Sequence, residues 1–230
     1  MDVQRSSGDG WLALIGGGEF SFGETLLADR AWLAKTPEGP IGFLPTASGS
    51  ADYGRHFAAY LGETFQRDVE TVPIYGSRDA RRGRNLERIE GCAGLYLGGG
   101  VADELIDVLA DSPALEALLS KLRGGGVVAA IGAAAQALGK VVRGLDGESR
   151  PGLLWLPKGV IEGNFDPGHD RRLRQLAATP GVSWGMGLPA GSALLMGPKG
   201  EAERVGTAFE LVDSEGDLEV LPGTVQAVDS

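Results

Sequence analysis

The chain has 230 residues, of which 43% are hydrophobic and 23% are charged, and 38 of them are glycines. This length and composition predict one globular domain with many tight turns and exclude a disordered chain. The formal net charge of −10 offers no basic surface to phosphate backbones or anionic lipids, so we expect neither nucleic-acid nor membrane binding.

The cysteine content and the ends of the chain set further limits. A single cysteine, Cys92, excludes an intrachain disulfide and a cysteine-rich metal site. No apolar run reaches the roughly 18 residues that span a bilayer, and residues 1–10 lack the apolar core of a signal peptide. These features predict a cytoplasmic protein with loose residues 1–10, one α/β domain over residues 11–220 and a tail over residues 221–230.

Up to residue 142, predicted strands alternate with predicted helices. Short apolar runs indicate strands at 11–15, at 39–45, at 69–75, before Gly98 and at 127–132. Helical spacing of apolar residues indicates helices at 25–35, at 53–65 and at 133–142, and a further helix that ends near residue 91. Another helix is indicated at 102–125, with an interruption at Ser112–Pro113. Continuously apolar strands favour a parallel sheet that is covered on both faces.

The last third of the chain has a different pattern of predicted elements. Short strands are predicted at 159–165, 182–186, 192–197, 202–206 and 207–212, with one helix at 169–178. Such close spacing indicates an antiparallel extension of the sheet. The predicted fold class is therefore α/β: a doubly wound, mostly parallel sheet flanked by helices in three layers, with antiparallel strands in the C-terminal third.

Three loops are expected at the carboxyl ends of the parallel strands, where open α/β sheets bind ligands. They are Gly16–Phe20, Gly98–Ala102 and Gly132–Gln136. The first, GGGEF, lacks the spacing of G-x-G-x-x-G, and no G-x-x-x-x-G-K-[ST] occurs in the chain. We therefore predict no nucleotide or other cofactor, and no metal site.

Six segments carry a family resemblance through their order and spacing. They are LALIGGGE, GFLPTAS, LYLGGG, AAIGAAAQ, VIEGNFD with RRLRQLAA, and GMGLPAGSALLM. With them the chain resembles the cyanophycinase and dipeptidase E family of serine peptidases over roughly residues 11–213. The resemblance implies a flavodoxin-like fold related to class I glutamine amidotransferases. It also implies an elbow, Gly-x-Ser-x-Gly, whose serine is activated by a histidine.

This sequence departs from the family pattern at the catalytic positions. The elbow falls on Gly132–Gln136, with Ala134 at the serine position and Gln136 at the second glycine. Asn164 replaces the histidine, and Ala190 stands where the acidic residue is expected. Alanine offers no nucleophile, an asparagine amide does not titrate usefully, and loss of a triad nucleophile typically costs about a million-fold in rate. The three positions are thus interpreted as vestigial.

Two functional hypotheses follow. In the first, the chain is a non-catalytic relative of these peptidases that binds a peptide- or amino-acid-like small molecule, or a protein partner, and can form a homodimer. The predicted ligand-binding residues are Gly17, Gly18, Glu19, Gly98, Gly99, Gly100, Ala134, Ala135, Gln136 and Asn164. In the second, the chain is a hydrolase with relocated groups: Ser192 or Ser48 as nucleophile and His169 as base, oriented by Asp166 or Asp170.

Overall fold

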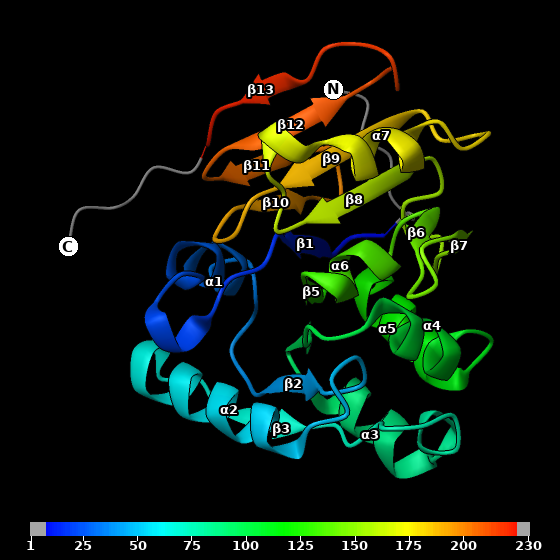
Figure 1. Cartoon of the computed structure of the whole chain (residues 1–230). Coiled ribbons are helices and arrows are strands. Elements are labelled where there is room, and N and C mark those ends of the chain that lie inside the picture. The colour runs from blue at the N-terminus through cyan, green and yellow to red at the C-terminus, as the bar shows by residue number, and fades with distance from the viewer. Residues whose placement is uncertain (1–7, 225–230) are drawn as a thin grey trace.

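The computed structural model describes residues 8–224 and is built on a seven-stranded sheet with the order β11-β10-β1-β5-β4-β2-β3 (Figure 1). Its strands are β1 (Trp11–Ile15), β2 (Ile41–Leu44), β3 (Val69–Thr71), β4 (Gly94–Leu97), β5 (Val127–Ile131), β10 (Ala193–Met196) and β11 (Ala202–Val205). Strands β1 to β5 are parallel, whereas β10 and β11 pair antiparallel to their neighbours. The predicted α/β class, with antiparallel strands late in the chain, is confirmed.

Helices cover both faces of this sheet. They are α1 (Leu26–Leu33), α2 (Ala51–Phe65), α3 (Gly83–Gly91), α4 (Ala102–Leu109), α5 (Pro113–Arg123) and α6 (Ala133–Ala137). Ala13 and Ile15 of β1 pack with α1 and α2, whereas Leu12 and Leu14 pack with the helices from α3 to α6. Because alternate side chains point to opposite faces and both faces are covered, the inner strands β1, β2, β4, β5 and β10 contain no charged residue.

The predicted interruption at Ser112–Pro113 separates α4 from α5. Asp111 adopts a positive φ of 53°, and the Ser112 hydroxyl then accepts a hydrogen bond of 3.2 Å from the Leu115 N–H. Pro113 occupies the first turn of α5, where its missing N–H has no helical partner to lose. A capping serine followed by proline is therefore a reliable start signal here.

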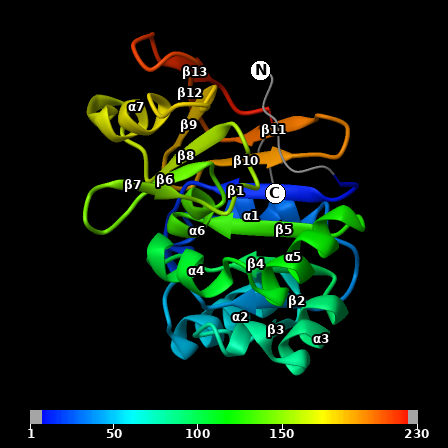
Figure 2. The same ribbon diagram turned by 90° about the vertical axis from the view of Figure 1, so that its right-hand side faces the viewer.

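The expected antiparallel extension is only partly right. A second sheet, with the order β13-β12-β9-β8, contains β8 (Gly159–Gly163), β9 (Trp184–Leu188), β12 (Ala208–Leu211) and β13 (Glu219–Leu221). Figure 2 shows it stacked beyond β1 and β10, with α7 (Arg171–Ala177) on its side. β8 and β9 are parallel because α7 connects them as a crossover. Only β10 and β11 extend the large sheet.

The helix predicted at 133–142 is also wrong in its second half. α6 ends at Ala137, and β6 (Val141–Arg143) instead forms a hairpin with β7 (Ser149–Pro151). The carbonyl of Ala137 accepts a 2.7 Å hydrogen bond from the Leu153 N–H, which draws this segment across the helix end. The β-branched pair Val141–Val142 then favours a strand.

Backbone hydrogen bonds extend to residues just outside the predicted domain limits of 11 and 220. The Gly10 N–H donates to the Leu122 carbonyl at 2.8 Å, and the Thr224 N–H donates to the Arg204 carbonyl at 2.9 Å. Residues 1–7 and 225–230, which were predicted to be loose, lie outside the described residues. Among residues 8–224, no helix is long and apolar enough to cross a membrane.

Candidate functional site

A cleft of about 380 Å³ lies at the carboxyl ends of β1, β4, β5 and β8. This is the edge of the sheet where the three glycine-containing loops were expected to meet a ligand. The lining residues are Gly17, Gly18, Tyr53, Gly99, Gly100, Ile131, Gly132, Ala133, Gln136, Glu162, Gly163, Asn164 and Arg172. Six separate segments of the sequence thus converge on one site.

Most of the predicted ligand-binding residues line this cleft, and the others do not. The ones that line it are Gly17, Gly18, Gly99, Gly100, Gln136 and Asn164. Gly98 is buried behind it, where a Cβ would come within 2.7 Å of the Phe43 ring. The Glu19 carboxylate turns back to its own loop and accepts a 2.9 Å hydrogen bond from the Ser21 hydroxyl. Ala134 and Ala135 are fully buried in the core.

The sharp turn of the elbow lies at Gly132, two positions before the predicted nucleophile position. Gly132 has φ 54° and ψ −117°, a conformation that side chains rarely adopt and that a strained strand-to-helix elbow imposes on its central residue. A Cβ built on Gly132 would meet no atom within 4 Å, so a side chain there would project into open space. The torsion angles therefore identify Gly132 as the elbow residue, whereas Ala134, the predicted elbow position, is buried in α6.

Asn164 lies at the mouth of the cleft, next to the first glycine loop. Its backbone is left-handed, with φ 47°, which asparagine tolerates better than most residues. Its N–H donates to the Gly16 carbonyl at 2.7 Å, and a Cβ on Gly17 would overlap its amide. Asn164 thus lines the cleft together with Gly132, and its amide supplies no base.

The relocated-hydrolase hypothesis required a serine and His169 in one place. The Ser192 hydroxyl is buried and donates to the Pro189 carbonyl at 2.7 Å. The Ser48 hydroxyl donates to the Pro45 carbonyl at 3.0 Å. Neither serine lines the cleft.

His169 lies on the exposed segment before α7. Its side chain is 86% exposed, and its Nδ1 lies 2.7 Å from Asp166 Oδ2. The predicted pairing with Asp166 is present, but His169 does not line the cleft. Ala190, the third vestigial position, is exposed in the turn between β9 and β10 and does not line it either.

Sequence reasoning missed a charged pair in the cleft. Glu162 on β8 is only 8% exposed, and its Oε1 lies 3.9 Å from Nη1 of Arg172. Burial raises the pKa of Glu162, and the nearby charges of Arg172 and Arg143 oppose that rise. A lone acid inside the apolar strand GVIEG was the available signal.

Tyr53 was missed as well. It stands on α2 and stacks on Phe20 with ring centroids 5.7 Å apart. Burial raises the pKa of Tyr53 to about 12, so its hydroxyl is a neutral donor and acceptor at physiological pH. Among the lining residues there is no serine, threonine, cysteine, histidine or lysine. Within residues 8–224, no three His, Cys, Asp or Glu side chains cluster in a way that could hold a metal ion.

Comparison with known proteins finds solved structures with a similar fold. No protein-family model and no curated protein sequence matches the chain. A crystal structure of a peptidase from an acI-B1 Actinobacterium aligns with a TM-score of 0.76 at 19% identity, covering 95% of this chain and 97% of that one. A provisionally named peptidase E protein from Listeria monocytogenes EGD-e aligns with a TM-score of 0.62 at 14% identity, covering 85% and 98%. The chain therefore has the fold of peptidase E-type proteins over most of its length.

Proposed function

We propose that the chain is a non-catalytic relative of peptidase E-type proteins whose cleft binds a peptide- or amino-acid-like ligand. One observation carries the proposal: the elbow residue that faces the cleft is Gly132, and the lining offers neither an aliphatic hydroxyl, a thiol nor an imidazole. A covalent acyl-transfer mechanism needs such a nucleophile next to a base. The site therefore retains the shape of a peptidase cleft and lacks the groups for that chemistry.

The polar groups of the cleft favour a zwitterionic ligand. The Glu162 carboxylate is buried, and its only described partner is Arg172 at 3.9 Å, beyond hydrogen-bond distance. A buried carboxylate without hydrogen bonds is costly, and a ligand ammonium would relieve that cost. Arg172 is then free to donate to a ligand carboxylate. Amino acids and short peptides carry both groups.

The glycine loops add a second argument for a peptide-like ligand. Gly17, Gly18, Gly99 and Gly100 expose backbone atoms to the cleft without side chains in between. A ligand backbone can therefore approach and hydrogen-bond to the loops directly. Gln136 provides an amide that can both donate and accept.

The test compares three proteins on Asp-containing and β-aspartyl dipeptides. They are the native chain, the double variant Gly132→Ser with Asn164→His, and the matched control Ala134→Ser with Asn164→His. We expect the native chain to bind dipeptides in calorimetry without hydrolysing them. We expect turnover only in the Gly132→Ser pair, because residue 132 projects into the cleft and residue 134 lies in the core.

Two results would contradict the proposal. Hydrolysis by the native protein would show that a nucleophile outside the elbow is at work. Failure of the native protein to bind any dipeptide would remove the binding role. Because Gly132→Ser strains the backbone by about 1–3 kcal/mol, its folding is checked by thermal unfolding before the assay.

A further inference from the structure

A second cavity of about 330 Å³ adjoins the cleft. Three side chains, Gln136, Glu162 and Arg172, line both spaces. These residues therefore form the boundary between two compartments of one site. We call the additional compartment the second chamber.

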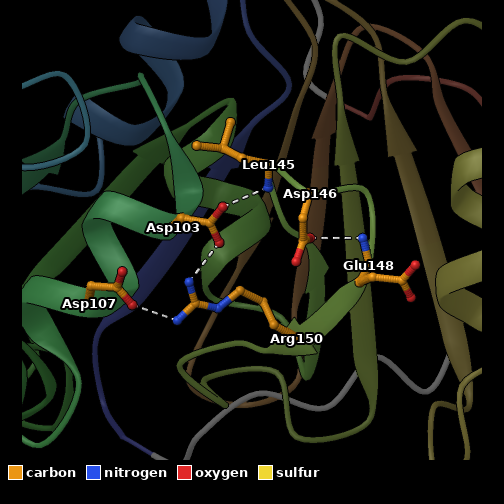
Figure 3. A network of polar contacts seen from close by, with 6 residues as sticks. All are labelled: Asp103, Asp107, Leu145, Asp146, Glu148 and Arg150. Atoms are coloured by element: carbon orange, nitrogen blue, oxygen red, sulfur yellow. Dashed lines mark hydrogen bonds and ion pairs between the residues drawn. The ribbon is translucent and has the colours of Figure 1, made fainter.

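The hairpin β6–β7 forms the outer wall of the second chamber through Val142, Arg143, Gly144, Leu145 and Gly147. A polar network holds this wall against α4 (Figure 3). Arg150 Nη1 lies 2.7 Å from Asp103 Oδ1, and its Nη2 lies 2.6 Å from Asp107 Oδ1. Asp103 Oδ2 also accepts a 2.7 Å hydrogen bond from the Leu145 N–H. The chamber thus has a wall fixed by several contacts.

The second chamber has an excess of positive charge. Arg143 and Arg172 both line it, against the single carboxylate of Glu162. Arg143 Nε donates to the Gly147 carbonyl at 3.2 Å, and among residues 8–224 its terminal nitrogens have no acceptor. Asp146 does not line the chamber, and its carboxylate accepts a 2.9 Å hydrogen bond from the Glu148 N–H within the hairpin turn (Figure 3). Two guanidinium groups around one cavity suit a carboxylate.

We propose that the second chamber is a carboxylate subsite, and that the ligand is a peptide of at least two residues lying across both compartments. Its first residue occupies the cleft with the ammonium group near Glu162, and its terminal carboxylate lies between Arg143 and Arg172. An extended dipeptide spans about 7 Å, enough to cross the boundary, whereas a free amino acid reaches only one compartment. This inference rests on the proposed function and specifies its ligand.

The carboxylate subsite is tested by calorimetry with three probes: the dipeptide Asp-Ala, its C-terminal amide, and free aspartate. We expect Asp-Ala to bind the native chain about ten-fold more tightly than the amide or aspartate, because only Asp-Ala places a carboxylate in the second chamber. Arg143→Gln should weaken Asp-Ala to the level of the amide and leave the amide unchanged. Arg143→Lys, which keeps the charge, should retain a preference for the acid.

Arg123→Gln serves as the matched control, since Arg123 pairs with Glu116 on the exposed surface at the end of α5. It should alter no affinity. Equal binding of acid and amide by the native chain, or equal weakening of both by Arg143→Gln, would overturn the subsite and leave the proposed function intact. Absence of binding by all three probes would overturn both.

Discussion

Gly132 combines the torsion angles of a strained strand-to-helix elbow with the absence of a side chain. The turn after β5 keeps φ 54° and ψ −117°, and its backbone is held by a 2.9 Å hydrogen bond from the Gly132 N–H to the Ile15 carbonyl. Glycine adopts this conformation without the steric cost that a side chain would bring. Glycine at this position relieves the turn of strain and leaves it without a side chain, which fits the binding role that we propose for the cleft.

Asp29 is the other residue whose environment is unusual. It is fully buried in α1 and accepts hydrogen bonds from Trp32 Nε1 at 2.8 Å and from the Tyr60 hydroxyl at 2.9 Å. Among the described residues it has no ion-pair partner. Burial raises the pKa of Asp29 more than these hydrogen bonds lower it. Its ionisation is therefore less favourable in the folded chain than in the unfolded one.

This predicts a pH-dependent contribution to stability. Between the ordinary aspartate pKa of about 3.9 and the raised folded value, the folded state binds more protons, so the free energy of unfolding falls as pH rises. Asp29→Asn removes the ionisation and should be more stable relative to the native chain at pH 7 than at pH 4. Urea unfolding at several pH values measures the difference. An equal difference between Asp29→Asn and the native chain at pH 4 and at pH 7 would contradict the prediction.

Single residues of the site were predictable to an unequal degree. The glycines after β1 and β4 were identified because they follow apolar strands at a known ligand edge. The elbow residue was not, because AAIGAAAQ contains several small residues and only the backbone torsion angles distinguish Gly132 from Ala134. Glu162 was missed because a lone acid in an apolar strand signals a special environment but does not show which cavity its carboxylate faces.

At the scale of elements, the hairpin β6–β7 depends on one acidic side chain of α4. Asp103 is only 16% exposed and contacts both Arg150 and the Leu145 N–H, whereas Asp107 is 64% exposed and contacts Arg150 alone. Its hydrogen bonds to Leu145 and Arg150 lower the pKa of Asp103, against the opposing effect of burial, so it remains charged at neutral pH. Asp103 is thus the main anchor of the wall of the second chamber.

Asp103→Ala should therefore loosen the hairpin locally. We expect the Leu145 amide to exchange its hydrogen about ten-fold faster, because its acceptor is removed and the opening of this segment becomes easier. The free energy of unfolding should fall by less than about 1 kcal/mol, since the pair with Arg150 is partly exposed to solvent. Hydrogen exchange followed by NMR measures the exchange rate of the Leu145 amide and, from the most protected amides, the free energy of unfolding. Asp107→Ala is the control; an equal effect of the two variants would show that Asp103 is no special anchor.

Elements with strong local signals were predicted well, and those set by long-range pairing were not. The apolar runs of β1, β2, β4 and β5 and the cap at Ser112 appear in the sequence itself. The division of the late strands between two sheets depends on α7, which joins β8 to β9 and makes them parallel. The same holds for β6, whose pairing with β7 overrode a helical pattern.

For the whole molecule, the position of the second sheet relative to the first decides whether a cleft exists. Gly163, at the end of β8, is a point of close approach: a Cβ there would lie 2.5 Å from the Gly16 carbonyl oxygen and 3.2 Å from Gly132 Cα. The next residue bonds across the same junction, from the Asn164 N–H to the Gly16 carbonyl. The loops of β1 and β5 therefore meet β8 backbone to backbone.

Gly163→Ala should push the two sheets apart at this junction. The added methyl group meets backbone atoms on two sides, which cannot rotate away, so we expect a loss of about 1–3 kcal/mol in the free energy of unfolding. Dipeptide binding should weaken as well, because the displacement moves Glu162 and Asn164 away from the glycine loops. Gly91→Ala, at the end of α3 where a Cβ meets nothing within 4 Å, is the control: it should not lower the free energy of unfolding, and it should leave dipeptide binding unchanged. The opposite result is an unfolding midpoint in urea and a dipeptide affinity that both equal those of the native chain. It would show that the junction tolerates a side chain and that the cleft does not depend on this close contact.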